Sequence, residues 1–205
     1  MIVYVESNFV LELAFLRDDH ASAQRILEHS EAQRLRLLMP AFCGGEPYES
    51  MIRRAKDRRS LQSRLDQEIR ELSRSQPYID IGTVSQNLTS ILAKSADEEK
   101  SRLDAALLRI IQAAEIIPLD GQALKQSLDF QVNLGLSPQD AIVFASIKAH
   151  LDTASLDEPK VLITKNAKDF LIPDITDLLT HANCKLLTRF SDGAGYIESV
   201  ITPPN

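Results

Sequence analysis

The sequence has few of the residues that mark secreted, membrane-spanning or zinc-binding proteins. Its two cysteines, Cys43 and Cys184, have no Cys or His neighbours at metal-ligand spacing, so we expect neither a disulfide framework nor a zinc site. No run approaches the roughly 20 apolar residues that span a bilayer, and Met1–Leu16 lacks the basic start of a signal peptide. We therefore expect a cytoplasmic protein that does not engage membranes.

Aromatic residues and histidines are also scarce. Tryptophan is absent and aromatic residues make up 5%, so stacking on nucleic-acid bases can add little specificity. The 7 glycines and 9 prolines are too few for a collagen-like or wholly disordered chain. With 205 residues, of which 44% are hydrophobic and 25% charged, the chain fits a single folded domain that spans residues 1–205.

The charge of the chain is unevenly distributed. A net charge of -6 argues against a protein that coats nucleic acid through bulk charge. The segment Met51–Arg64, by contrast, holds six basic side chains and one acidic one. It favours a contact with nucleic-acid phosphates through Arg53, Arg54 and Lys56. The alternative is a solvated helix face whose cations pair with nearby acids, namely Asp57, Asp66 and Glu68.

Short apolar and β-branched runs alternate with helical patterns along most of the chain. Such alternation predicts βαβ units, and therefore a parallel sheet with helices on both faces. In an open sheet of this kind, functional groups lie beyond the carboxyl ends of the strands. The expected strands are Ile2–Val5, Leu35–Met39, Glu115–Leu119, Lys160–Thr164 and Cys184–Leu187.

The middle of the chain departs from this alternation. Between Ser50 and Ala114 helix formers and paired charges are dense, and the only strand signal is a weak one at Tyr78–Ile81. We expect a helical insertion over about 53–114, broken at Ser73–Pro77 and again at Ser95–Glu99.

Polar and acidic residues follow the expected strands at four places. They are Glu6 with Asn8, Glu46 with Glu49, Asp140 in Ser137-Pro138-Gln139-Asp140, and Asn166 with Asp169. Each place also has a purely structural explanation. Glu6 or Asn8 can cap a helix, Glu46 and Glu49 can complement a helix N-terminus, Asp140 can close a capping box with Ser137, Asn166 can form an Asx-turn, and Asp169 can lie on the surface.

The conjunction of the four places is more informative than any one of them. A parallel sheet would bring all four together, and crowded carboxylates repel one another unless divalent cations neutralise them. Ligands rich in oxygen, with few His or Cys, select Mg²⁺ or Mn²⁺ over zinc. The sequence is compatible with one ion or with two.

With these four groups of residues, the sequence resembles the PIN-domain family of metal-dependent nucleases, which includes the toxins of VapBC-type toxin–antitoxin pairs. The order and spacing of the motifs match from Met1 to about Tyr48 and from about Glu115 to Phe190. The blocks that carry the likeness are Val5-Glu6-Ser7-Asn8-Phe9-Val10-Leu11-Glu12, Cys43-Gly44-Gly45-Glu46, Leu136-Ser137-Pro138-Gln139-Asp140-Ala141 and Ile163-Thr164-Lys165-Asn166-Ala167-Lys168-Asp169-Phe170.

The resemblance implies a Rossmann-like α/β/α sandwich with a parallel sheet of about five strands, and a Mg²⁺- or Mn²⁺-dependent ribonuclease. It gives Glu6, Glu46, Asp140 and Asp169 the roles of metal-binding and catalytic acids, with Asn8, Asn166 and Glu49 supporting them. The fourth acid position is matched by either Asn166 or Asp169. The implied partners are RNA, single-stranded or structured, an antitoxin protein and a second copy of the chain.

Three departures from the family pattern bear on activity. The first acid is usually Asp, position 43 usually carries a hydroxyl residue, and compact relatives lack the long stretch from Arg53 to Ala114. These departures keep a second hypothesis open, namely a weak or inactive member that binds nucleic acid or serves as a scaffold. The sequence lacks the Asp nucleophile that an aspartyl-phosphate enzyme carries after its first strand. It also lacks the Gly-rich phosphate loop that a nucleotide-cofactor enzyme needs.

Overall fold

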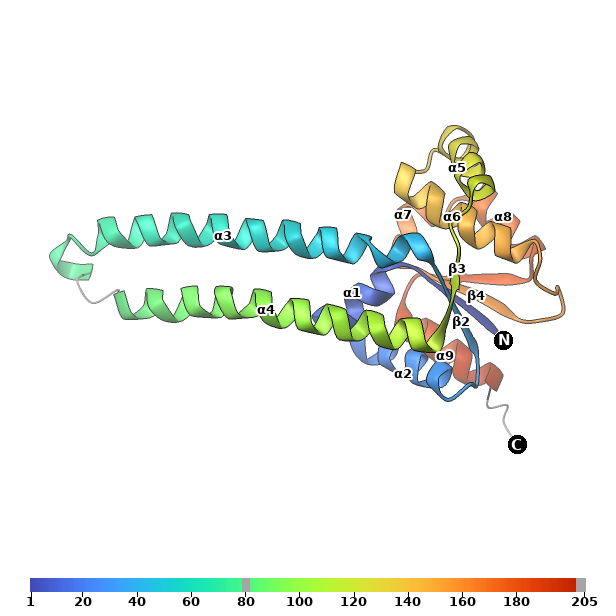
Figure 1. The fold of residues 1–205 in the computed structure, drawn as a ribbon, viewed down its shortest axis with the longest axis horizontal. Helices are drawn as coiled ribbons and strands as arrows, with labels where there is room; N and C mark the ends of the chain where they lie inside the picture. Colours follow the sequence, from blue (N-terminus) through green and yellow to red (C-terminus); the bar gives the residue numbers. More distant parts are fainter. Residues whose placement is uncertain (79–81, 202–205) are drawn as a thin grey trace.

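A five-stranded parallel sheet forms the centre of the molecule (Figure 1). The computed structural model describes residues 1–78 and 82–201, with the backbone alone at 82–89, 93, 96 and 97. The strands lie in the order β3-β2-β1-β4-β5, and every neighbouring pair is parallel. The predicted parallel sheet is confirmed. Its strands are β1 Ile2–Val5, β2 Arg36–Pro40, β3 Ala114–Ile117, β4 Lys160–Ile163 and β5 Cys184–Leu187.

Helices cover both faces of the sheet, which confirms the α/β/α sandwich. One face carries α1, α2 and α9, and the other carries α5, α6 and α8 (Figure 1). No helix among residues 1–78 and 82–201 is long and apolar enough to cross a membrane. The helices are α1 Ser7–Phe15, α2 His20–Glu31, α3 Glu46–Leu72, α4 Gly82–Ala113, α5 Gly121–Asn133, α6 Pro138–Leu151, α7 Ala167–Phe170, α8 Pro173–His181 and α9 Phe190–Ile201, with short 3₁₀ turns at Ala41–Gly44 and Gln76–Tyr78.

The apolar runs form strands because both faces of the sheet are covered. All four residues of β1 and all four of β4 are buried, so these strands read as continuous rather than alternating apolar runs. The bounds predicted for β1 and β5 are confirmed. β3 ends at Ile117 instead of Leu119, because Pro118 has no N–H to continue the ladder.

Helices α3 and α4 run side by side as a long hairpin that extends well beyond the body (Figure 1). The break predicted near Ser73–Pro77 is confirmed, since α3 ends at Leu72. The break predicted at Ser95–Glu99 is wrong, because α4 continues through it. There Ser95 and Glu99 accept hydrogen bonds from Arg58 of α3, so these polar residues join the two helices instead of turning the chain. Of the weak strand signal, Tyr78 lies in a 3₁₀ turn, and 79–81 lie outside the described residues.

Candidate active site

The candidate site lies at the edge of the sheet where the strands end. β1 is the middle strand, with β2 on one side and β4 on the other. A reversal of strand order of this kind leaves a crevice outside the carboxyl ends of the two neighbouring strands. Glu6 follows β1 and Thr164 follows β4, so both border this crevice. The hairpin leaves the body from the same edge (Figure 1).

Glu6 is the most buried of the predicted acids, at 7% exposure. It is the N-cap of α1, and its Oε2 accepts hydrogen bonds from the Asn8 backbone N–H at 2.9 Å and from Asn8 Nδ2 at 3.2 Å. The capping role and the pairing with Asn8 are therefore both present. The other oxygen, Oε1, is buried and has no hydrogen-bond partner among the described residues. Burial raises the pKa of Glu6, and the contacts with Asn8 and the neighbouring Thr164 hydroxyl only partly oppose this rise.

Glu46 is held beside Glu6 by a hydroxyl that the sequence reasoning did not single out. Ser7 Oγ donates a hydrogen bond to Glu46 Oε2 at 2.5 Å, which joins α1 to the first residue of α3. The negative charge of Glu46 also contributes to the raised pKa of Glu6. The sequence could have indicated Ser7, because this residue directly follows Glu6 at the end of β1.

Cys43 lies buried next to these two acids. Burial raises the pKa of its thiol, and the negative charges of Glu6 and Glu46 raise it further. The side chain is therefore a neutral thiol at physiological pH, and it adds no charge to the site.

Asp140 and Asn166 form the second half of the site. Ser137 caps α6, and the buried residues Phe144, Ile147 and Leu151 fix this helix against the sheet. Asp140 Oδ1 accepts a hydrogen bond from Asn166 Nδ2 at 2.9 Å, and Oδ2 accepts one from Ser137 Oγ at 2.5 Å. The predicted capping box differs in detail, because the Asp140 carboxylate accepts a hydrogen bond from the Ser137 hydroxyl instead of from the Ser137 backbone N–H.

Thr164 connects the two halves. Its hydroxyl oxygen accepts a hydrogen bond from the Asn166 backbone N–H at 3.0 Å, and the same hydroxyl neighbours Glu6. Thr164 is fully buried at the end of β4. A buried hydroxyl that directly follows a core strand was the signal by which the sequence could have revealed it.

Five of the predicted residues are brought together in two groups. Glu6 lies with Asn8 and Glu46, and Asp140 lies with Asn166. Within residues 1–78 and 82–201, no three His, Cys, Asp or Glu side chains converge closely enough to hold a metal ion. Asp169 is half-buried on α7 and Glu49 is exposed on α3, and neither side chain has a hydrogen bond or ion pair within the described part of the chain. Their roles stay predictions.

The donor set suits a hard divalent cation. Its side chains offer carboxylate, carboxamide and hydroxyl oxygens, which Mg²⁺ and Mn²⁺ prefer. The unpartnered Glu6 Oε1 is a buried acceptor that its own surroundings leave unsatisfied. Such a group costs free energy unless a cation or a proton compensates it.

The three predicted RNA-binding cations point in two directions. Arg53 and Lys56 are exposed on α3, and Arg53 Nη2 lies 3.5 Å from Ser50 Oγ. Arg54 instead lies over the Phe15 ring of α1 at 4.7 Å, with its Nη1 buried and unpartnered in the described chain. The guanidinium of Arg54 therefore packs at the base of the hairpin, while its two neighbours face solvent.

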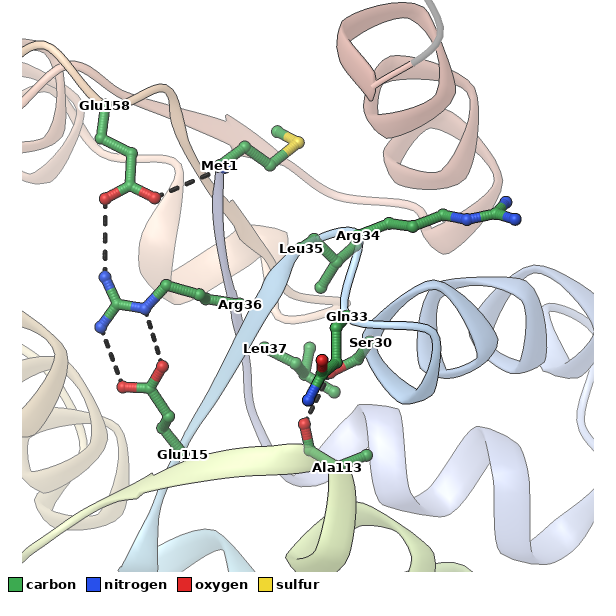
Figure 2. A pocket seen from close by; sticks show the side chains of 10 residues that line it. All are labelled: Met1, Ser30, Gln33, Arg34, Leu35, Arg36, Leu37, Ala113, Glu115 and Glu158. Atoms are coloured by element: carbon green, nitrogen blue, oxygen red, sulfur yellow. Dashed lines mark hydrogen bonds and ion pairs between the residues drawn. The ribbon is translucent and has the colours of Figure 1, made fainter.

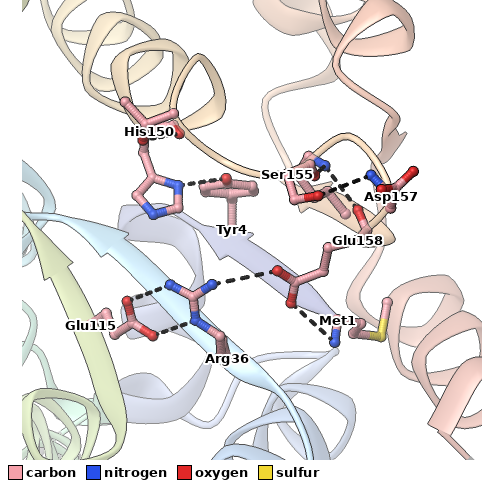
Figure 3. Close-up of polar contacts among 10 residues, drawn as sticks. Met1, Tyr4, Arg36, Glu115, His150, Ser155, Asp157 and Glu158 are labelled. Carbon is pink, nitrogen blue, oxygen red and sulfur yellow. Dashed lines mark hydrogen bonds and ion pairs between the residues drawn. The ribbon is translucent and has the colours of Figure 1, made fainter.

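A separate charged cluster lies at the opposite edge, where the strands begin (Figures 2 and 3). The Arg36 guanidinium donates to both oxygens of Glu115 at 2.7 and 2.9 Å, and its Nη1 reaches Glu158 at 3.5 Å. Glu158 also pairs with the Met1 α-amino group at 3.4 Å. A pocket of about 390 Å³ opens beside this cluster, where Ser30 Oγ donates to the Ala113 carbonyl oxygen at 2.6 Å (Figure 2).

Tyr4 and His150 complete this edge (Figure 3). The Tyr4 hydroxyl lies 2.7 Å from His150 Nδ1. Burial raises the pKa of Tyr4 and lowers that of His150, so both groups are neutral near pH 7 and the hydroxyl donates to the ring nitrogen. The charges of Arg36, Glu115, Glu158 and the Met1 α-amino group pair with one another, and these pairs join β2 and β3 to the starts of β1 and β4.

Comparison with known proteins assigns the fold to a family. A family model for the PIN domain matches residues 3–170. None of the curated proteins matches the sequence. Among solved structures, a similar chain comes from the "Crystal structure of VapBC2 from Rickettsia felis bound to a DNA fragment from their promoter"; the two chains share 14% identity over 91% of this chain and 97% of that chain, with a TM-score of 0.42. Since the PIN-domain model spans well over half of the 205 residues, the chain belongs to the PIN-domain family.

Proposed function

We propose that this protein is a nuclease that hydrolyses RNA phosphodiester bonds with the help of Mg²⁺ or Mn²⁺. PIN domains are generally nucleases, and the finer assignment of substrate and metal is our inference. The observation that carries it is the Glu6 carboxylate, buried at the crevice between β1 and β4 with one oxygen unpartnered among the described residues. A buried carboxylate of this kind, among other oxygen donors, is what a divalent-cation site needs.

Four acids would hold the cation, directly or through water: Glu6, Glu46, Asp140 and Asp169. Asn8 fixes the Glu6 carboxylate through two hydrogen bonds, and Ser7 fixes Glu46 through one. Asn166 fixes Asp140 in the same way, and the exposed Glu49 would act through water. The chemistry that a bound cation supplies is Lewis acidity, which favours ionisation of the attacking water and offsets charge on the leaving oxygen.

This chain's own side chains position the cation and the RNA, and none of them is required as a nucleophile. The raised pKa of Glu6 makes its carboxylate a site where a cation replaces a proton. Arg53 and Lys56, exposed on the helix that begins at Glu46, would attract phosphates that the acids alone would repel. Arg54 would support them from the base of the hairpin.

The decisive experiment is incubation of the purified protein with mixed RNA in Mn²⁺ and, separately, in EDTA. We expect cleavage in Mn²⁺, none in EDTA, and none with Asp140→Asn in either. Asp152→Asn is the matched control, because Asp152 lies at the other end of α6 and pairs with Lys148. Absence of cleavage by the unaltered protein in Mn²⁺ would refute the proposal.

A second candidate function rests on Glu6 standing where the family usually has Asp. If the longer side chain has displaced the metal, the protein would be an inactive PIN domain that binds nucleic acid or serves as a scaffold. A thermal melt separates the two, because an intact site gains stability by mass action when Mn²⁺ binds. No shift at millimolar Mn²⁺ would favour the scaffold.

The partners that we propose beyond RNA are an antitoxin protein and a second copy of the chain, in the cytoplasm. A small open reading frame beside the gene would support the antitoxin. Co-expression of the two products, followed by size-exclusion chromatography with light scattering, would test both partners in one experiment.

A further inference from the structure

The outer face of α3 carries a row of exposed cations. Arg53, Lys56, Arg59 and Arg64 recur at intervals of three to five residues, which places them along one side of the helix. All four are exposed, and none forms an ion pair within the described part of the chain. We call these four residues the basic row.

Most of the other cations of the hairpin pair with acids; within the described residues the exceptions are Arg54, which packs on Phe15, and Arg70 near the end of α3. Arg58 faces α4 instead, where its guanidinium donates to both oxygens of Glu99 at 2.5 and 3.0 Å. On the exposed side of α4 the cations pair within the helix, as Lys94–Glu98, Lys100–Asp104 and Arg102–Glu98. A solvated helix face is expected to be laced with such pairs. The basic row lacks them although Asp57 is exposed within it, so its charge is available to an anionic ligand.

The basic row leads away from the candidate site. α3 begins at Glu46, and at 1.5 Å per residue Arg53 lies about 10 Å and Arg64 about 27 Å farther along the helix axis. The hairpin projects from the edge where the strands end, so this row continues outward from the crevice (Figure 1). A polyanion seated at the crevice could therefore follow α3 without a bend.

We propose that the basic row binds the RNA strand on one side of the scissile bond, so that Arg59 and Arg64 contact phosphates several nucleotides from the site of cleavage. This inference rests on the proposed function, since it takes the crevice as the place where RNA is cut. The occupant is an RNA strand because the row offers cations spaced along a line, as the phosphates of a strand are. Few aromatic side chains are present for stacking on bases, so the contacts are with phosphates. The basic row would thus read the length of the flanking strand and not its sequence.

The test compares two RNAs that share one cleavage site. One has a flank longer, and the other a flank shorter, than the roughly 4 to 16 nucleotides that single-strand-binding surfaces cover. For the unaltered protein we expect kcat/KM to be several-fold higher with the long flank. The double variant Arg59→Gln, Arg64→Gln should bring this ratio close to one. The matched control is Lys94→Gln, Lys100→Gln on α4, which should keep the ratio of the unaltered protein.

Binding of the same RNAs in EDTA separates this inference from the proposed function. We expect the double variant to bind the long RNA more weakly and to lower the slope of log affinity against log salt by about 1.4, that is, about 0.7 for each lost phosphate contact. If neither the unaltered protein nor the variants cleave RNA, the proposed function fails, and this binding result still decides the inference. An unchanged length ratio with an unchanged salt slope would overturn it. If the double variant binds RNA normally but no longer binds a polyglutamate peptide that the unaltered protein binds, the inference is overturned and the row binds an acidic protein partner instead.

Discussion

The Glu6 carboxylate is buried, and one of its oxygens has no partner among the described residues, so its charge destabilises the fold when no ligand is bound. Glu6→Gln keeps the shape of the side chain and can still accept the hydrogen bond from the Asn8 backbone. We therefore expect the metal-free variant to be more stable than the unaltered protein. What the variant removes is the buried charge. Uncompensated burial of such a group costs about 1 to 3 kcal/mol, and each kcal/mol shifts Tm by about 2 to 4 °C at this chain length, so Tm should rise by about 2 to 12 °C.

The pH dependence of this difference has a definite sign. Burial holds the pKa of Glu6 in the folded protein above its ordinary value. As pH rises through the ordinary pKa of glutamate, the unfolded chain loses its proton first, and the folded state loses stability relative to it until pH passes the raised pKa. Glu6→Gln removes this loss. In EDTA, the Tm advantage of the variant should therefore be small at low pH and larger at pH 8.

Mn²⁺ should offset this difference in stability. At a concentration of 100 times Kd, a ligand that binds only the folded state adds about 2.7 kcal/mol, which corresponds to roughly 5 to 11 °C for a chain of this size. We expect this gain for the unaltered protein and little of it for Glu6→Gln, measured by thermal melts across a Mn²⁺ titration.

Glu12→Gln is a matched control for Glu6→Gln. Glu12 is also buried, but it accepts hydrogen bonds from Lys165 Nζ and from the Asp19 backbone N–H, both at 2.9 Å. The same chemical change should therefore destabilise the protein, since Lys165 loses a partner, and should leave the Mn²⁺ gain intact. Equal Mn²⁺ gains in Glu6→Gln and the unaltered protein, or no stabilisation of Glu6→Gln in EDTA at pH 8, would refute the reasoning.

Three further substitutions test other parts of the site and hairpin. Asp140→Asn should reduce cleavage to background while costing no more than about 1 kcal/mol in urea unfolding, the scale of a helix cap; unfolding of the variant with normal cleavage by its folded fraction would show a structural role only. Glu6→Asp withdraws the carboxylate by one methylene and should lower Mn²⁺ affinity and rate, whereas faster turnover would indicate a decayed site. Glu99→Gln leaves Arg58 without its counterion and should cost about 3 kcal/mol in urea unfolding, against less than about 1 kcal/mol for the exposed control Glu98→Gln; equal losses would contradict the buried pairing.

The strands could be predicted because their residues have one possible environment. β1 and β4 are apolar on both faces, and only a covered parallel sheet buries such runs. Polar residues at the strand ends then had to share one edge, which is why Glu6 and Asn166 could be placed near each other from the sequence. The family resemblance added the roles.

Side-chain direction and pairing could not be predicted. Ser95–Glu99 has the composition of a break, and it is helical because Arg58, distant in sequence, takes up its polar groups. Arg53 and Arg54 are adjacent and chemically identical, yet only the packing of α1 against the hairpin turns Arg54 onto Phe15. Such tertiary contacts override local propensity and leave no mark at the position itself.

The two buried cysteines make the protein ready for single-site labelling. Burial raises the pKa of Cys184 to about 12 and raises that of Cys43 as well, so almost no thiolate forms at neutral pH and alkylating reagents should pass both by. A new thiol at the far end of the hairpin, introduced as Ser75→Cys at an exposed position, would then react alone. A fluorophore attached there would let ensemble or single-molecule optics follow the tip of the arm in an otherwise native chain.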